Sequence, residues 1–212
     1  SAGSSTSRQT RTMRIRLRQV ALVAADLAVA EDRIERELGL ERCHRDPGVA
    51  TFGLHNVLYA IGDQFLEVVS PTQPGTTAGR HIDKRGGDSG YMVILEVDDL
   101  EPFRRRFDEH GVRVVFEAVD DGIVGLHLHP ADVGGAILSI DRTDRWGEWP
   151  WAGPVWRDHV RSDTVDEVLA VEIEADDPTA MSERWAQVLG CDAADGTVAL
   201  PDGGEIRFVA SG

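Results

Sequence analysis

Residues 90–115, which decide the fold, read GYMVILEVDDLEPFRRRFDEHGVRVV. The apolar run near the start of this stretch indicates a buried strand that ends at Asp99. Asp99 suits a helix N-cap, because its carboxylate can accept hydrogen bonds from free backbone N–H groups. Leu100, Phe103 and Phe107 then share one helix face, and Gly111 can adopt the left-handed conformation that ends a helix. The stretch therefore predicts a strand followed directly by an amphipathic helix.

The same pattern occurs twice more in the chain. Residues 20–27 (VALVAADL) and 171–178 (VEIEADDP) resemble residues 93–100 (VILEVDDL). Each copy ends with a helical pattern that runs from an Asp to a Gly, namely Asp26 to Gly39, Asp99 to Gly111 and Asp177 to Gly190. Self-similarity of this kind indicates a repeated structural unit. We assign these Asp and Gly residues to helix capping and not to chemistry.

Short strands are expected after each helix. They lie near 50–54, 56–62 and 65–70 in the first copy, and near 113–118, 122–129 and 136–141 in the second. In the third copy only 197–200 and 205–210 follow the helix. The sequence thus predicts an α+β fold of paired βαβββ modules with a truncated third module. A half-formed module cannot close its own sheet, so we expect it to pack on the main domain or on another chain.

The repeats also suggest how the chain is divided. We expect a disordered tail at 1–12, a two-module domain at 13–141, a Trp-rich connector at 142–164 and a partial third module at 165–212. Within the domain, module 1 covers 14–70, a linker 71–90 and module 2 91–141. Met13 is a candidate for the native start.

The linker and the connector each allow two interpretations. The linker holds Thr76, Thr77, Arg80 and Arg85, which could bind a carboxylate or phosphate. It lacks the Lys-Ser/Thr ending of a phosphate-binding loop, so a plain linker is expected. The connector holds four of the five tryptophans, Trp146, Trp149, Trp151 and Trp156. We expect it to attach the third module to the main domain, with an apolar lid over a cavity as the alternative.

Composition excludes several classes of function. The net charge of −15 argues against binding to nucleic acid or to an anionic membrane, because both need a positive surface, but it is compatible with a cationic ligand. Two cysteines, Cys43 and Cys191, do not form a disulfide framework and favour a reducing compartment. Residues 1–12 lack the apolar core of a secretory signal, and no apolar run is long enough to span a membrane. We expect a cytoplasmic protein.

Residues 90–115, together with LHLHPADVGGAILSID at 126–141, resemble the vicinal oxygen chelate superfamily. This group includes glyoxalase I, methylmalonyl-CoA epimerase, extradiol dioxygenases and bleomycin-resistance proteins, and the similarity is greatest to the epimerase-like branch. The resemblance covers roughly residues 14–141. It implies that two modules form an incomplete barrel around a divalent metal, and that the first and last strand of each module each supply one ligand.

The ligand positions implied by the resemblance fall on Gln19, Glu67, Met92 and Ser139. The family usually has His and Glu at the last two positions. A thioether and a hydroxyl are poor ligands for a divalent metal, so we expect a degenerate site without metal. The equivalent positions in the third copy, Ala170 and Arg207, cannot bind one. If a metal does bind, Gln19, Glu67 and His127 are the expected ligands, and His129 and Asp141 are further replacements.

Several of these side chains are also candidates for chemistry. Glu67 lies in an apolar strand, where burial would raise its pKa and make it a plausible proton acceptor. Gln19 could orient a ligand through its amide. His127 and His129 point to the same face of one strand and could act as general bases, although structural roles in a buried contact and a turn are the alternative. The expected catalytic residues are Glu67 and His127. The expected ligand-binding residues are Gln19, Glu67, Met92, His127, Ser139 and Asp141.

Three functions remain open at this point. The first is a small-molecule-binding protein that binds an oxygenated or cationic ligand in the cavity between modules 1 and 2, with no cofactor. The second is a lyase or isomerase of the glyoxalase or epimerase type, in which Glu67 is the base, with or without a divalent metal. The third is an assembly protein that forms a homodimer through the partial third module. A small-molecule partner is expected, and neither nucleic acid nor a membrane is.

Overall fold

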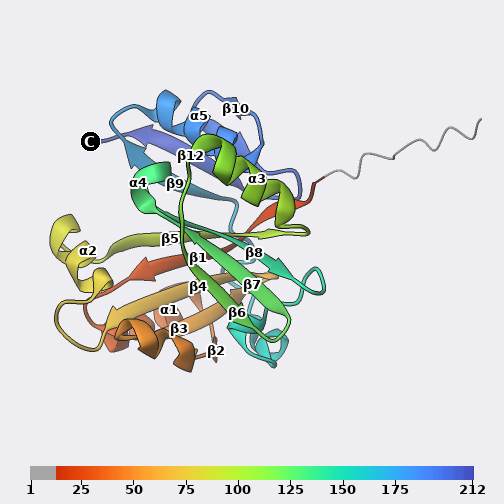
Figure 1. The fold of residues 1–212 in the computed structure, drawn as a ribbon. Coiled ribbons are helices and arrows are strands. Elements are labelled where there is room, and N and C mark those ends of the chain that lie inside the picture. The colour runs from red at the N-terminus through yellow and green to blue at the C-terminus, as the bar shows by residue number, and fades with distance from the viewer. Residues whose placement is uncertain (1–12) are drawn as a thin grey trace, which may run out of the picture.

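The computed structural model describes residues 13–212, so the tail expected at 1–12 lies outside the described residues. The described part contains an eight-stranded sheet in the order β2-β3-β4-β1-β5-β8-β7-β6 and a four-stranded sheet in the order β10-β11-β12-β9. The large sheet curls into a half-barrel, and the small sheet lies at one side of it, next to α3 and α5 (Figure 1). This arrangement confirms the predicted α+β fold.

The elements follow the predicted repeat closely. The first unit comprises β1 (Ile15–Val23), α1 (Leu27–Leu38), β2 (Arg42–His44), the 3₁₀ helix η1 (Pro47–Phe52), β3 (Leu54–Ile61) and β4 (Gln64–Pro71). The second comprises β5 (Ser89–Val97), α3 (Glu101–His110), β6 (Val114–Asp120), β7 (Ile123–Leu128), α4 (Pro130–Val133) and β8 (Ile137–Thr143). The third comprises β9 (Ala170–Ala175), α5 (Pro178–Leu189), β10 (Ala193–Ala194), β11 (Thr197–Ala199) and β12 (Glu205–Ala210).

The three units share one topology. In each, the first strand pairs in parallel with the last strand, as β1 with β4, β5 with β8, and β9 with β12. The antiparallel pairing of β1 with β5 joins the first two units into one sheet. The third unit is short, but the two-residue strand β10 completes its set of strands. The expectation that only two strands follow its helix is therefore wrong, because β10 is too short to leave a periodic pattern.

The helix ends follow the expected capping except at Asp99. Asp26 accepts hydrogen bonds from the backbone N–H groups of Ala28 and Val29, and Asp177 accepts one from Ala180. The three expected glycines, Gly39, Gly111 and Gly190, adopt the left-handed conformation at the ends of α1, α3 and α5. The N-cap expected at Asp99 is wrong by one residue, because Leu100 occupies the cap position without a side-chain cap, and Asp99 instead accepts from the N–H of Glu101.

Two expected segments differ in the structure. Most of the strand expected at 50–54 is occupied by η1, and the short strand β2 pairs with the edge of β3 that β4 leaves free. Asp46 and Pro47 start a 3₁₀ helix there, because the Asp46 carboxylate accepts from the N–H of Gly48 and Pro47 has no N–H to give to a sheet. The linker at 71–90 contains the helix α2 (Thr77–Arg85), which Thr76 caps by accepting from the N–H of Gly79.

The third unit packs on the main domain through one continuous core. Trp185 of α5 is fully buried, stacks edge-on with Phe208 of β12 and donates its indole N–H to the Gly134 carbonyl. The same core contains Phe103 of α3 and Leu17 of β1. The apolar face of the third unit is therefore covered by its own chain. Among residues 13–212 no helix is long and apolar enough to cross a membrane.

Candidate functional site

The concave face of the large sheet encloses a cavity of about 850 Å³. Strand alternation decides which side chains reach it: along β4, Glu67 and Val69 face inward, whereas Val68 packs on the outside with the core around α1. The wall is completed by η1, β3, β5, β6, β7 and the residues around the start of α2. A volume of this size suits an organic molecule far larger than a metal ion.

Glu67 is the central polar group of the β4 wall. Its side chain is buried, and its two oxygens accept hydrogen bonds from Nε2 of Gln19 at 2.8 Å and Nδ2 of Asn56 at 2.6 Å. Burial raises the pKa of Glu67 to about 7, although both hydrogen bonds lower it, and Asp46 raises it further. No cation pairs with Glu67 among residues 13–212. The carboxyl group is therefore held in place and is poised to gain or lose a proton near neutral pH.

The amide of Gln19 is oriented by a tryptophan of the connector. Nε1 of Trp149 donates to Oε1 of Gln19 at 2.7 Å. An indole N–H can only donate, so the amide oxygen must face Trp149 and the amide nitrogen must face Glu67. Asn56 is fixed in the same way, because its Oδ1 accepts from the backbone N–H of Asp46 at 2.8 Å. Both neighbours of Glu67 are thus committed to donate.

Asp141 of β8 is a second buried carboxyl on the wall. It accepts from Oγ of Ser139 at 2.5 Å and from Nε1 of Trp151 at 2.7 Å. Burial raises the pKa of Asp141 to about 6. Gly125 of β7 lies opposite Asp141, and a Cβ there would meet the Asp141 carboxylate at 2.8 Å. Glycine at this position leaves the carboxylate the space it occupies.

His127 of β7 also lines the cavity. Its ring lies 5.4 Å from the ring of Phe116, and its nitrogens make no hydrogen bond within residues 13–212. Burial lowers the pKa of His127 to about 4, so the ring is neutral at neutral pH and offers one donor and one acceptor. His129 has a structural role instead, because its Nδ1 caps α4 by accepting from the N–H of Ala131.

The structure brings most of the expected site residues together. Gln19, Glu67, Met92, His127 and Asp141 all line the cavity. Ser139 lies on the same face of β8 as Ile137 and Asp141, but it is not one of the residues that line the cavity, because its hydroxyl donates to Asp141. Sequence reasoning missed Asn56, Trp149 and Trp151 as partners of the buried carboxyl groups. An Asn in the apolar strand LHNVLYAI was the available signal for the first of these.

The four positions implied by the resemblance do not fit a divalent metal. The oxygen of Gln19, which would be its ligand atom, already accepts from Trp149. Met92 supplies a soft thioether, and Ser139 donates to Asp141. In the alternative set His127 is a suitable ligand, but the Gln19 oxygen has only one lone pair left beside the bond from Trp149. Within residues 13–212 no group of three or more His, Cys, Asp or Glu side chains is arranged to hold a metal ion.

The connector closes one end of the half-barrel. Trp149 and Trp156 are buried against Phe65, and the guanidinium of Arg18 lies within 6 Å of all three rings. Burial lowers the pKa of Arg18 to about 10, which leaves it charged at neutral pH, and Glu96 lies 3.4 Å from its Nε. The connector therefore packs on the barrel, and Trp151 also forms part of the cavity wall.

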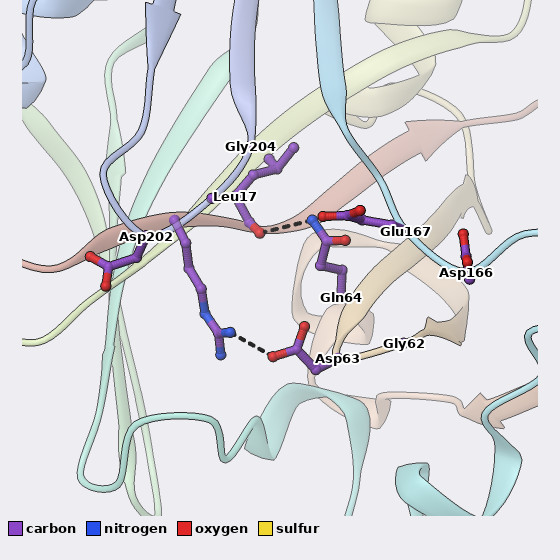
Figure 2. Close-up of a pocket in the computed structure, with 10 residues that line it drawn as sticks. Leu17, Gly62, Asp63, Gln64, Asp166, Glu167, Asp202 and Gly204 are labelled. Carbon is purple, nitrogen blue, oxygen red and sulfur yellow. Dashed lines mark hydrogen bonds and ion pairs between the residues drawn. The ribbon is translucent and has the colours of Figure 1, made fainter.

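A second, smaller pocket of about 260 Å³ lies where the third unit meets the barrel (Figure 2). Its polar centre is Gln64, which donates to the carbonyls of Leu17 and Val168 and accepts from the N–H of Val168. The acidic side chains Asp63 and Asp202 pair with arginines. These bonds hold the chain that leads into β9 against the barrel, and we assign this pocket to structure.

The sequence is similar to those of known proteins. The family described as "Glyoxalase-like domain" matches residues 20–189. An ethylmalonyl-CoA/methylmalonyl-CoA epimerase of Cereibacter sphaeroides is 24% identical over 137 residues, which cover 60% of this chain and 97% of that protein.

Two solved structures show the same fold. Methylmalonyl-CoA epimerase from Mycobacterium tuberculosis has a TM-score of 0.53 at 24% identity and covers 60% of this chain and 87% of its own. A variant of Streptomyces coelicolor methylmalonyl-CoA epimerase in complex with 2-nitronate-propionyl-CoA has a TM-score of 0.54 at 18% identity and covers 61% and 98%.

Proposed function

Because the chain belongs to the glyoxalase-like domain family, we propose that it binds an oxygenated or cationic small molecule in the cavity between modules 1 and 2, without a metal ion. The observation that carries the proposal is the pair of buried carboxyl groups on the wall, Glu67 and Asp141. Each accepts two hydrogen bonds from neutral donors. Neither has a cationic partner among the described residues.

The unused hydrogen-bonding capacity of these groups supports a ligand role. An ionised carboxylate has about four acceptor sites, so two remain free on Glu67 and two on Asp141. Burial of an under-satisfied carboxyl group costs several kcal/mol, at the order-of-magnitude level. A ligand that donates hydrogen bonds or carries positive charge would offset this cost. Burial without such a ligand would only destabilise the fold.

The experiment is a thermal-shift screen against a panel of metabolites and antibiotics. Wild type is compared with Glu67→Gln and with Glu183→Gln, a matched control on the exposed face of α5 that removes the same charge. We expect hits on wild type to be retained by Glu183→Gln and to shift Glu67→Gln less. If every wild-type hit stabilises Glu67→Gln equally, Glu67 is not part of the site.

A second candidate is a lyase or isomerase in which Glu67 transfers a proton. It is favoured by the pKa of Glu67, about 7, since a general base works best when its pKa lies near the working pH. The epimerases among the similar proteins point in the same direction. Incubation of each screening hit in D₂O distinguishes the candidates: exchange of a substrate hydrogen that Glu67→Gln abolishes would favour the enzyme, and binding without exchange would favour the binder.

A further inference from the structure

The Asp and Glu side chains on the cavity wall are not balanced by Lys or Arg side chains of the described residues. Four carboxyl groups line it, those of Asp46, Glu67, Asp120 and Asp141, and no Lys or Arg of residues 13–212 does. The sequence is not short of basic residues, since it has 22 Lys and Arg. Their exclusion from the wall leaves a negative potential inside the cavity, where low-dielectric walls strengthen it.

The basic side chains closest in sequence to the wall are occupied elsewhere. Arg80, four residues beyond the cap of α2, donates to the carbonyl of Gly75 at 2.6 Å and to Oγ1 of Thr77 at 3.1 Å. Arg45 pairs with both oxygens of Glu31, on the outer side of the barrel. Of the arginines that could have bound a carboxylate or phosphate, neither Arg80 nor Arg85 lines the cavity, although Arg80 is near enough to the wall residue Tyr91 to act on its pKa.

The rest of the wall suits an apolar body. Phe52 of η1 and Phe116 of β6 meet edge-on, with ring centroids 5.1 Å apart, and both line the cavity although they stay partly exposed. Tyr91 and Met92 of β5 line it as well. Aromatic faces attract ammonium groups through cation–π interactions, particularly where water is excluded. The neutral ring of His127 adds an acceptor without positive charge.

We propose that the ligand is an organic ammonium compound with an apolar or aromatic body, and this rests on the function proposed above. Its ammonium group would pair with Glu67, Asp141 would add to the negative potential of the cavity, and its body would contact the aromatic wall around Phe116. An anionic ligand would be repelled by four carboxyl groups with no basic side chain to compensate. The start of α2 also reaches the wall and its partial positive charge favours an anion, so the test includes one.

The test uses three probes that share a body and differ in charge: phenylbutylamine, phenylbutanol and phenylbutyrate. Each is titrated into the full chain by isothermal calorimetry at pH 7.5. We expect the amine to bind at least about tenfold more tightly than the carboxylate, with the alcohol between them, which corresponds to about 1.4 kcal/mol. The carboxyl variants Glu67→Gln and Asp141→Asn should each weaken the amine more than the alcohol. Glu183→Gln should leave all three affinities unchanged.

The outcomes separate this proposal from the function on which it rests. Equal affinity for amine and alcohol, or tightest binding of the carboxylate, would overturn the ammonium assignment and leave a small-molecule site in the cavity. If none of the three probes binds and the panel screen yields no hit, the ammonium assignment and the proposed small-molecule binding are both wrong. If either carboxyl variant fails to fold, the ranking of the three probes on wild type still decides the matter.

Discussion

Nε1 of Trp149, in the connector, donates a hydrogen bond of 2.7 Å to Oε1 of Gln19, in the first strand of the barrel. This bond is made between residues 130 positions apart. It determines which end of the Gln19 amide faces Glu67, because an indole cannot accept. A residue outside the two modules thus fixes the hydrogen bonding of the central carboxyl group of the cavity. A second connector residue, Trp151, donates its indole N–H directly to Asp141.

Trp149→Phe removes this indole N–H and keeps a ring that can stack on Phe65. Gln19 is then free to turn, and Glu67 loses a fixed donor that lowers its pKa. We expect the pKa of Glu67 to rise further above 7 and the affinity for phenylbutylamine at neutral pH to fall about 5–30-fold, for a loss of about 1–2 kcal/mol.

The diagnostic readout for Trp149→Phe is the pH profile of amine binding. Affinity should rise as Glu67 loses its proton, and the midpoint of this rise should move to higher pH in the variant. Trp156→Phe is the matched control, because Trp156 lies in the same buried cluster and makes no hydrogen bond to the cavity network. A purely structural role for Trp149 would lower affinity without moving the midpoint.

Glu67→Gln should flatten the dependence of stability on pH. Burial raises the pKa of Glu67 from 4.5 to about 7, so at this residue the folded state binds more protons between these values, and the contribution of Glu67 to stability falls as pH rises through them. The fall is on the order of 3 kcal/mol at most, from the size of the shift. Urea unfolding at pH 4.5, 6 and 8 measures it. The difference between variant and wild type should grow across this window and then stay constant, and an unchanged slope would contradict the raised pKa.

His127→Gln should act in the opposite direction. Burial lowers the pKa of His127 from 6.5 to about 4, so at this residue the unfolded state binds more protons in this range, and the contribution of His127 to stability rises with pH across it. Loss of the histidine should remove that rise, which is on the order of 3 kcal/mol at most. The same unfolding series, extended to pH 4, provides the measurement. His129→Gln is the control, because it removes a histidine two positions away whose role is to cap α4. Equal slopes in wild type and His127→Gln would contradict the prediction.

The purified chain should contain no stoichiometric transition metal. The Gln19 oxygen is engaged by Trp149, and Met92 and Ser139 are poor ligands for a divalent ion. Elemental analysis of protein prepared without chelator gives the metal content. Added zinc, nickel or manganese should leave the melting temperature of wild type and of Glu67→Gln equally unchanged. About one metal ion per chain, lost on substitution of Glu67, would contradict this prediction and favour the lyase or isomerase function.

Local patterns in the sequence were enough to predict the elements and their repetition. A strand that ends in Asp, a helix with one apolar face and a closing Gly depend on backbone geometry within a few residues. The three units built on Asp26, Asp99 and Asp177 could therefore be located without a structure. The same reasoning failed at β10, which is too short to show a pattern, and at η1, where Asp46 and Pro47 start a 3₁₀ helix in place of the expected strand.

The candidate site was only partly accessible in this way. The resemblance directed attention to Gln19 and Glu67, and strand alternation placed them on the inner face of the barrel. The tertiary structure alone brought Trp149 and Trp151 to the buried carboxyl groups and kept every described Lys and Arg off the cavity wall. Such contacts join residues far apart in the chain, so they depend on how whole elements pack. Short-range periodicity and capping carry no information about that packing.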